Sequence, residues 1–325
     1  MELVKKKCLK DEITVNSLIE TPVLLFFNPL VGCAYIGGRA EDVLKLVFNK
    51  CQDNNLIIKN KFILNSTLKM VATNFNVETL LPAIIAIAYY AFVFFFAEIT
   101  RKIVGLIFKK SSLIYVLLIE LIGTAQMCTC VYENSVIVKH YGPIGFFFAV
   151  SMLLLSGNLL NRGAFVTPLP VIEQFFTGRM SSEKFLALIF AQSVGGYSAF
   201  CLANSLWYYS LSYSIDHLQL FERLPCAINY KVPFNYVFIN EMPLFVKTRL
   251  IPFIISGFLT FSLVYIGIPG LNPVVASSRL MGCPGLDLQW FMITYWLCPV
   301  IGWMMAVKLD KIKMVKKKQH KKKEK

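Results

Sequence analysis

The sequence predicts an all-α polytopic membrane protein. Of its 325 residues, 56% are hydrophobic and only 16% are charged, and the mean hydropathy is +0.59. Soluble domains carry about 45–50% apolar and about 25% charged residues, so these values exclude an ordinary soluble enzyme. A disordered chain is excluded as well, because so much apolar surface would not stay solvated.

The net charge of +14 is concentrated near the C-terminus, so it does not indicate a nucleic-acid-binding face. Residues 308–325 hold ten Lys and only two acidic residues, and they supply +8 of the total. The nine Cys are an odd number and several lie in apolar runs, which argues against a scaffold held by disulfides.

Six apolar runs are long enough to cross a bilayer as helices, which takes about 20 residues at about 1.5 Å rise per residue. They cover residues 77–100, 113–132, 143–160, 185–209, 250–267 and 288–307. Residues 22–38, interrupted by Asn28-Pro29, are a weaker candidate. Residues 232–246 contain two prolines, and their length predicts a re-entrant or interfacial segment.

The positions of Lys and Arg predict the orientation, because short cytoplasmic loops are enriched in them. We take residues 101–112 as cytoplasmic and count 232–246 as a crossing. Nineteen Lys and Arg then lie on the cytoplasmic side, the tail included, and four lie opposite: Lys139, Arg223, Lys231 and Arg279. The C-terminus is therefore expected in the cytosol.

Two stretches rich in Gly and Pro, residues 163–170 and 267–275, directly follow predicted spans. Thr167-Pro168 and Asn272-Pro273 both read as starts of short helices, with Pro at the first helical position. Such backbone survives at membrane depth only when it is buried in protein or lines a wet cavity. The pair indicates an inverted repeat with a site at the midplane; the alternative is two surface loops, each followed by a capped helix.

Three stretches carry a distinctive set of motifs. Residues 163–200 contain Ala191-Gln192 and Gly195-Gly196, a later stretch reads GLNPVVASS, and the last apolar run reads YWLCPVIG. Glu120 and Thr124 form a Glu-x-x-x-Thr arrangement in an earlier run. Together these motifs resemble the aquaporins, most of all the unorthodox intracellular superaquaporins, over about residues 113–308.

The resemblance implies an aquaporin-like inverted repeat with six spans and two re-entrant half-helices, plus an extra N-terminal apolar helix over residues 77–100. It further implies a channel bundle over residues 101–308, a basic cytosolic tail over 309–325 and a homotetramer. Residues 1–76 lie outside the resemblance, and their structure is not predicted.

The resemblance assigns two pore boxes, Thr167-Pro168-Leu169 and Asn272-Pro273-Val274. Asn272 would donate its amide N–H to a single-file water, and two half-helix dipoles would repel protons there. Thr167 replaces the first Asn, but its hydroxyl can still cap the helix. Leu169 and Val274 replace small Ala residues, so a wider or distorted midpoint is expected.

The selectivity filter implied by the resemblance is apolar. Val275 stands where the family carries an Arg, and Phe147 is its expected partner. A Phe/Val filter would favour larger or less polar solutes over strict selectivity for water. Arg279 would either substitute for the lost Arg or lie in a solvated loop.

The remaining candidate residues have structural interpretations. Glu120 and Glu241 would support the pore loops by accepting hydrogen bonds from their backbone N–H groups, and Cys128 and Cys130 are expected as buried thiols. Three scattered His form no metal-ligand set. No cofactor and no catalytic constellation is expected.

The predicted function is a passive channel for water or small neutral solutes, such as glycerol or hydrogen peroxide, in an intracellular membrane. One alternative is a non-conducting structural membrane protein, because the fourth span is predicted to be shortened around residues 232–246. Another is a secondary transporter, which only the intramembrane carboxylates suggest. Asn65-Ser66-Thr67 is the single glycosylation sequon, and a span over 77–100 would place it in the lumen.

The chain ends in Lys322-Lys323-Glu324-Lys325, which resembles the dilysine signal that coat machinery reads to return membrane proteins to the endoplasmic reticulum. We predict that the double substitution Lys322→Ser and Lys323→Ser releases the protein toward the cell surface, as measured by surface biotinylation. The pair Lys316→Ser and Lys317→Ser removes the same charge and should leave the protein in place. If both pairs behave alike, tail charge and not the terminal signal determines the location.

Overall fold

The computed structural model describes residues 77–222, 226–233, 236–237, 240, 250–268 and 270–323, and these contain helices and loops but no strand. The helices are α6 (Val77–Ile107), α7 (Leu113–Leu160), α8 (Pro168–Phe176), α9 (Ser182–Ser210), α10 (Ile215–Glu222), α12 (Ile251–Phe261), η2 (Ser262–Ile266), α13 (Pro273–Leu280), α14 (Leu288–Met292), η3 (Ile293–Leu297) and α15 (Cys298–Lys323). Residues 1–76 with Asn65, the candidate span 22–38, Glu241 and most of 232–246 lie outside the described residues.

Four of the described helices are long and apolar enough to cross a membrane: 79–107, α7, α9 and 288–310. α12 and η2 form a shorter apolar helix over Ile251–Ile266. α6 extends seven residues beyond its predicted end at 100, and α15 continues through the apolar run into the basic tail as far as Lys323. The all-helical membrane class predicted from the sequence is confirmed for the described chain.

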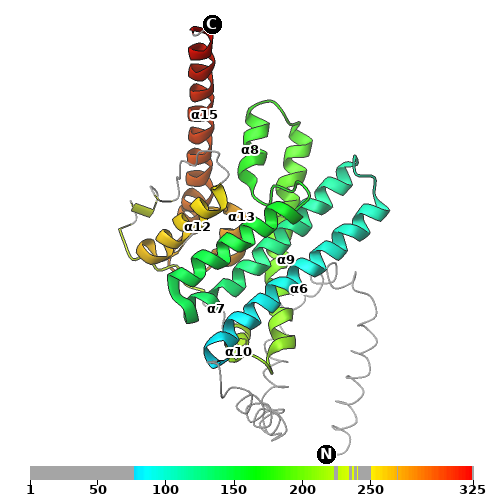
Figure 1. The fold of residues 1–325 in the computed structure, drawn as a ribbon, viewed down its shortest axis with the longest axis vertical. Coiled ribbons are helices and arrows are strands. Elements are labelled where there is room, and N and C mark those ends of the chain that lie inside the picture. Colours follow the sequence, from blue (N-terminus) through cyan, green and yellow to red (C-terminus); the bar gives the residue numbers. More distant parts are fainter. Residues whose placement is uncertain are drawn as a thin grey trace, which may run out of the picture. The chain divides into compact units, whose positions relative to one another are not determined.

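α7 contains two of the predicted spans in one 48-residue element. The helix bends at Gly142, whose φ of 61° is readily adopted only by glycine, and Pro143 starts the second half. Figure 1 shows the two halves folding back on each other, with α6 beside the first half. The first half is longer than predicted, because it reaches the bend instead of ending at residue 132.

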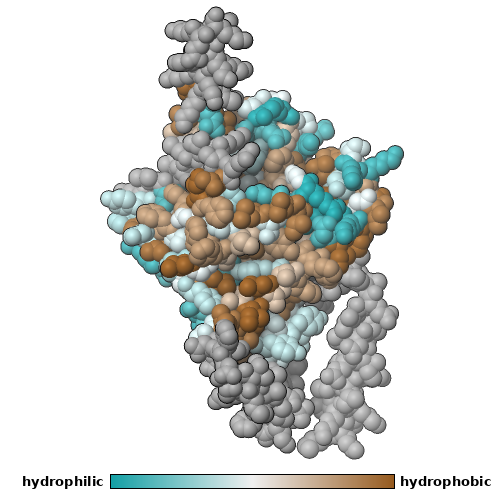
Figure 2. Space-filling model, in the orientation of Figure 1, coloured by the Kyte–Doolittle hydropathy of each residue, from teal (hydrophilic) through white to brown (hydrophobic). Residues whose placement is uncertain are grey.

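The distribution of polarity is the reverse of that in a soluble protein. Phe95, Leu106 and Phe190 are 65%, 87% and 71% exposed, and Figure 2 shows hydrophobic side chains over much of the visible face. Charged and amide side chains such as Glu133 and Gln192 are fully buried instead. Helices that bury their polar groups and expose apolar ones are suited to lipid.

Helix α6 is attached to α7 at both ends. Near its start the helix contains Pro82, and the Tyr141 hydroxyl donates to Thr79 O (2.6 Å) and accepts from Ala83 N (3.0 Å). This hydroxyl therefore lies between Ala83 N and Thr79 O, which would form a direct hydrogen bond in a regular helix. Farther along, Tyr90 donates to Asn134 Oδ1 at 2.6 Å.

At the other end of α6, the Arg101 guanidinium is fully buried. It donates to Gln126 Oε1 at 2.5 Å and to Asn161 Oδ1 at 3.3 Å, and both acceptors belong to α7 or its C-cap. Glu98 is ion-paired with Arg162 as well as with Arg101. A buried cation needs such partners to offset its lost hydration, so Arg101 fixes the register between α6 and α7.

Two adjacent glycines bring α9 close to its neighbours. A Cβ on Gly195 would lie 2.7 Å from Leu121 O, and a Cβ on Gly196 would lie 2.6 Å from Val274 Cγ1. α9 can therefore pack tightly on both α7 and α13 only because these positions lack side chains, as small residues commonly allow in membrane helices.

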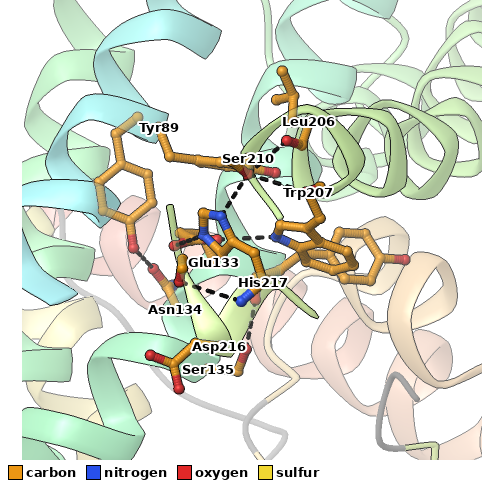
Figure 3. Close-up of polar contacts among 12 residues, drawn as sticks. Tyr89, Glu133, Asn134, Ser135, Leu206, Trp207, Ser210, Asp216 and His217 are labelled. Atoms are coloured by element: carbon orange, nitrogen blue, oxygen red, sulfur yellow. Dashed lines mark hydrogen bonds and ion pairs between the residues drawn. The ribbon is translucent and has the colours of Figure 1, made fainter. Parts of the chain in front are cut away.

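A buried polar cluster joins α7, α9 and α10 away from the glycine contacts (Figure 3). Glu133 Oε2 accepts from Trp207 Nε1 at 3.1 Å, and Glu133 Oε1 lies 2.9 Å from His217 Nε2. His217 Nδ1 in turn lies 2.6 Å from Ser210 Oγ. Ser210 Oγ donates to Leu206 O at 2.7 Å, so its proton is already used and the arrangement is structural.

A second ion pair holds α10 to the bend of α7. Asp216 accepts from Lys139 Nζ at 2.7 Å and lies 2.9 Å from His140 Nε2. Burial by itself raises the pKa of the Asp216 carboxyl, but its hydrogen bonds and the nearby positive charges outweigh this effect, so the pKa lies below its ordinary value. The pair therefore stabilises the fold at neutral pH, and this contribution is lost as pH falls through the lowered pKa.

We predict that His217→Leu lowers the free energy of unfolding by about 3–5 kcal/mol, because it leaves the Glu133 carboxylate buried without its partner. The double variant His217→Leu, Glu133→Leu should lose less unfolding free energy than the single variant, because it also removes the Glu133 carboxylate. Thermal unfolding of the detergent-solubilised chain measures both. Additive losses would show that the two side chains are not energetically coupled.

Candidate functional site

A cavity of about 430 Å³ lies among α7, α12, α15 and the starts of α8 and α13. Its wall is mostly apolar and includes Val150, Leu153 and Leu259. The polar side chains that line it are few: Asn134, Asn158, Asn161, Thr167, Asn272, Arg279 and Trp303. Concave, mostly apolar sites with a few placed polar groups are typical of small-molecule sites.

The loop before α8 is held by Glu120, which is 1% exposed. Its carboxylate accepts from the backbone N–H groups of Phe165 (2.9 Å) and Val166 (2.6 Å) and from Gln192 Nε2 (2.8 Å). Gln192 Nε2 also donates to Thr167 O at 3.1 Å. The Glu120 carboxylate thus accepts the backbone N–H groups of a loop that offers them no acceptor of its own. The loop backbone is left-handed at Val166, where φ is 59°.

Thr167 lies at the start of α8, as predicted, but its hydroxyl does not cap the helix. Thr167 Oγ1 is buried and makes no hydrogen bond with the described residues. Because Pro168 occupies the first helical position and has no N–H, the first turn already lacks one donor. Thr167 lines the cavity instead.

Asn272 caps α13 and also reaches the other short helix. Its Oδ1 accepts from Val274 N at 3.1 Å, and its Nδ2 donates to Val166 O at 3.0 Å. The starts of α8 and α13 therefore meet at the cavity wall. The amide has two N–H donors, and the described contacts use one of them.

The two bulky box residues lie differently. Leu169 lines the cavity, whereas Val274 is 3% exposed and packs against Gly196 of α9. The absence of a side chain at Gly196 provides the space for Val274. Val274 therefore contributes to helix packing, and the wider or distorted midpoint expected from Leu169 and Val274 stays a prediction.

Of the two residues expected in the filter, Val275 lines the cavity and Phe147 does not. The neighbouring Phe146 lines the cavity in its place. The Phe147 carbonyl accepts from Ser256 Oγ at 2.5 Å, and its ring packs toward Gly257 of α12. The lining positions of this half of α7 are 146, 150, 153, 154, 157, 158 and 161. They follow helical periodicity, so helical register along α7 could have indicated Phe146.

Arg279, four residues after Val275, also lines the cavity and is half-buried in the last turn of α13. It does not lie in a solvated loop. Of the predicted thiols, Cys128 and Cys130 are buried and carry no disulfide.

Cys226 and Cys283 form a disulfide with a Cα–Cα distance of 5.1 Å, which the sequence argument against a scaffold held by disulfides did not anticipate. Cys201 is disulfide-bonded as well. The Cys226–Cys283 bond connects residues 226–231 to the segment after α13, where Ile228 N also donates to Pro284 O at 2.9 Å. Both partners lie in loops that only the tertiary fold brings together.

The chain is similar to several known proteins. Aquaporin-10 of Caenorhabditis elegans is 40% identical over 243 residues, which cover 70% of this chain and 86% of that protein. Aquaporin-11 of Mus musculus is 28% identical over 60% of this chain and 77% of its own length. Aquaporin-11 of Milnesium tardigradum is 21% identical, with shares of 73% and 90%. No family model and no solved structure matches the chain.

We predict that Glu120→Gln lowers the free energy of unfolding by about 1–3 kcal/mol, because the new amide cannot accept all three hydrogen bonds and buried donors are left unpaired. Thermal unfolding in detergent measures the change. Glu222→Gln, at an exposed position of α10, is the matched control and should change stability little. Equal effects of the two substitutions would contradict the loop-holding role of Glu120.

Proposed function

Because the chain belongs to the aquaporin family, we propose that it is a passive channel for water and small neutral solutes such as glycerol and hydrogen peroxide. As a member of that family it is an integral membrane channel and not an enzyme. The proposed solute path is the cavity that meets the starts of both short helices.

The observation that carries the proposal is the hydrogen bond from Asn272 Nδ2 to Val166 O. It joins the starts of α8 and α13 at the cavity wall, so the positive ends of two helix dipoles converge there. Such an arrangement disfavours cations at the midpoint while amide and hydroxyl groups hydrogen-bond a neutral solute. Asn272 would supply the amide group.

The proposed topology has six aquaporin-like crossings, of which the fourth falls in the region of residues 232–246, with α6 as the extra crossing and α8 and α13 as re-entrant half-helices. Contacts along the first half of α7 support it. Glu120 meets the loop before α8, Tyr132 donates to Ser278 O of α13 at 2.5 Å, and Lys139 pairs with Asp216 beyond the bundle. α13 thus lies nearer the bend of α7 than the loop before α8 does.

The filter proposed for this path consists of Phe146 and Val275 in place of an aromatic–arginine pair. Both line the cavity, and Leu169 adds apolar surface near the first box. A weakly polar wall lowers the advantage of water over less polar solutes, because it offers few replacements for the hydrogen bonds that water loses on entry. The channel is therefore proposed to pass glycerol as well as water.

Transport coupled to protons is less well supported. Glu120 and Glu133 are the buried carboxylates of α7, and both accept hydrogen bonds from fixed protein donors. Neither lines the cavity. A proton-coupled carrier would need a titratable group in the solute path.

The proposed location is the endoplasmic reticulum, with the C-terminus in the cytosol and a homotetramer as the assembly. The Cys226–Cys283 disulfide supports this orientation, because disulfides form in oxidising compartments. It lies at the loops that the Lys and Arg count assigns to the lumenal side. Asn65 as a glycan site and Lys322-Lys323 as the retrieval signal belong to the same proposal.

Stopped-flow swelling of proteoliposomes tests the function, first under an impermeant osmolyte and then under glycerol. Proteoliposomes that contain the wild-type protein should change volume faster than empty liposomes in both measurements. Val275→Trp would fill the cavity wall and abolish the acceleration, whereas Val264→Trp, at an exposed position of η2, should leave it intact. Wild-type rates equal to those of empty liposomes would favour the non-conducting structural protein.

We also predict that Val275→Arg lowers glycerol passage relative to water by about tenfold or more, because the bulky side chain narrows the constriction against the larger solute. Val275→Leu keeps the wall apolar and should preserve the ratio. Both are measured as the quotient of glycerol and water permeabilities in the same vesicles. An unchanged ratio in the Arg variant would remove Val275 from the filter.

A further inference from the structure

We propose that Arg279 is the charge-selective residue of the cavity and excludes cations and protons from the path of neutral solutes. This inference rests on the channel function proposed above. It assigns the electrostatic barrier to a position one helical turn beyond the one that the family pattern implies.

Arg279 and Val275 lie on the same face of α13. They are four residues apart, both line the cavity, and α13 is helical from Pro273 to Leu280. Side chains at positions i and i+4 lie one above the other on a helix. At about 1.5 Å per residue, the cation is displaced by about 6 Å along α13, away from Asn272.

Among the described residues that line the cavity, Arg279 carries the one charged side chain. The other lining residues are apolar, glycine, hydroxyl, amide or indole residues. The ion pairs of the described arginines join Arg101 and Arg162 to Glu98, and Arg179 to Glu173. Arg279 has no such carboxylate partner in the described chain, so its positive charge acts on whatever enters the cavity.

The backbone around Arg279 is fixed from three sides. Tyr132 of α7 donates to Ser278 O, Trp296 Nε1 of η3 donates to Ser277 Oγ at 2.9 Å, and the disulfide holds Cys283. The last turn of α13 is therefore held by two neighbouring helices just before Arg279 and by a covalent bond just after it. A charge carried on a fixed backbone segment moves less when a solute passes, which makes it a more effective barrier.

The placement also explains how a guanidinium without a carboxylate partner among the described residues is tolerated. Arg279 lies in the last turn of α13, where the carbonyl ends of the helix carry partial negative charge. Its side chain is half-buried and borders the cavity. The helix end stabilises the cation without cancelling its field, because the helix dipole supplies only about half an elementary charge.

For a neutral solute the same group is not a barrier. A guanidinium offers five N–H donors and no acceptor, so it can hydrogen-bond the oxygens of water, glycerol or a peroxide while it repels cations. Arg279 would thus make the otherwise apolar path selective by charge, with size and polarity set near Val275.

The test uses the full-length chain in proteoliposomes, with a pH-sensitive dye inside the vesicles and an applied pH gradient, followed by methylammonium uptake. Arg279→Val should raise the proton and methylammonium rates about ten- to a hundredfold, the factor expected when one unit charge about 6 Å away is removed at an effective dielectric constant near 20. Arg279→Lys keeps the charge and should restore low rates. Lys231→Val removes the same charge from an exposed loop position and should behave as wild type.

Water and glycerol swelling of the same preparations separates the two claims. Neutral-solute flux in Arg279→Val with no rise in cation rates would overturn the role of Arg279 and leave the channel function standing. If neither wild type nor Arg279→Val passes any solute above empty liposomes, the channel function fails and this inference fails with it. A rise in cation rates that Arg279→Lys does not suppress would show that side-chain volume, and not charge, forms the barrier.

Discussion

The carboxylate of Glu120 is the interaction on which the rest of the site depends. Two backbone N–H groups of the loop before α8, those of Phe165 and Val166, donate to no backbone carbonyl of a helix, and lipid would offer them no partner. Glu120 accepts both, and Gln192 connects the same acid to the Thr167 carbonyl. With this loop fixed, Val166 O is in position to accept from Asn272, which brings the two short helices together.

Around this centre, the paired buried side chains position the helices. Arg101 sets α6 against α7, Glu133 and His217 hold α10 to the bundle, and Asp216 attaches it to the bend of α7. Burying such groups is costly unless they are paired, so each pair admits one arrangement and penalises others. Close glycine contacts at Gly195 and Gly196 then allow dense packing where no polar pair is needed.

The residues of α13 have different roles because they contact different neighbours. Asn272 faces the junction of the short helices, Val274 packs on α9, and Val275 and Arg279 face the cavity. One eight-residue helix thus presents a polar cap, a packing face and a lining face. Each face has a different neighbour, so substitutions one position apart are expected to affect different properties of the protein.

The sequence by itself determined the membrane class, most of the helix positions and the starts of α8 and α13, because hydrophobic run length and Pro after a capping residue are local signals. Only the tertiary structure decided that Phe146 and not Phe147 lines the cavity, that Val274 turns toward Gly196, and that Cys226 meets Cys283. These outcomes depend on how each helix is rotated about its axis and on which distant loops meet. Both are set by packing between segments far apart in the chain, which local patterns do not encode.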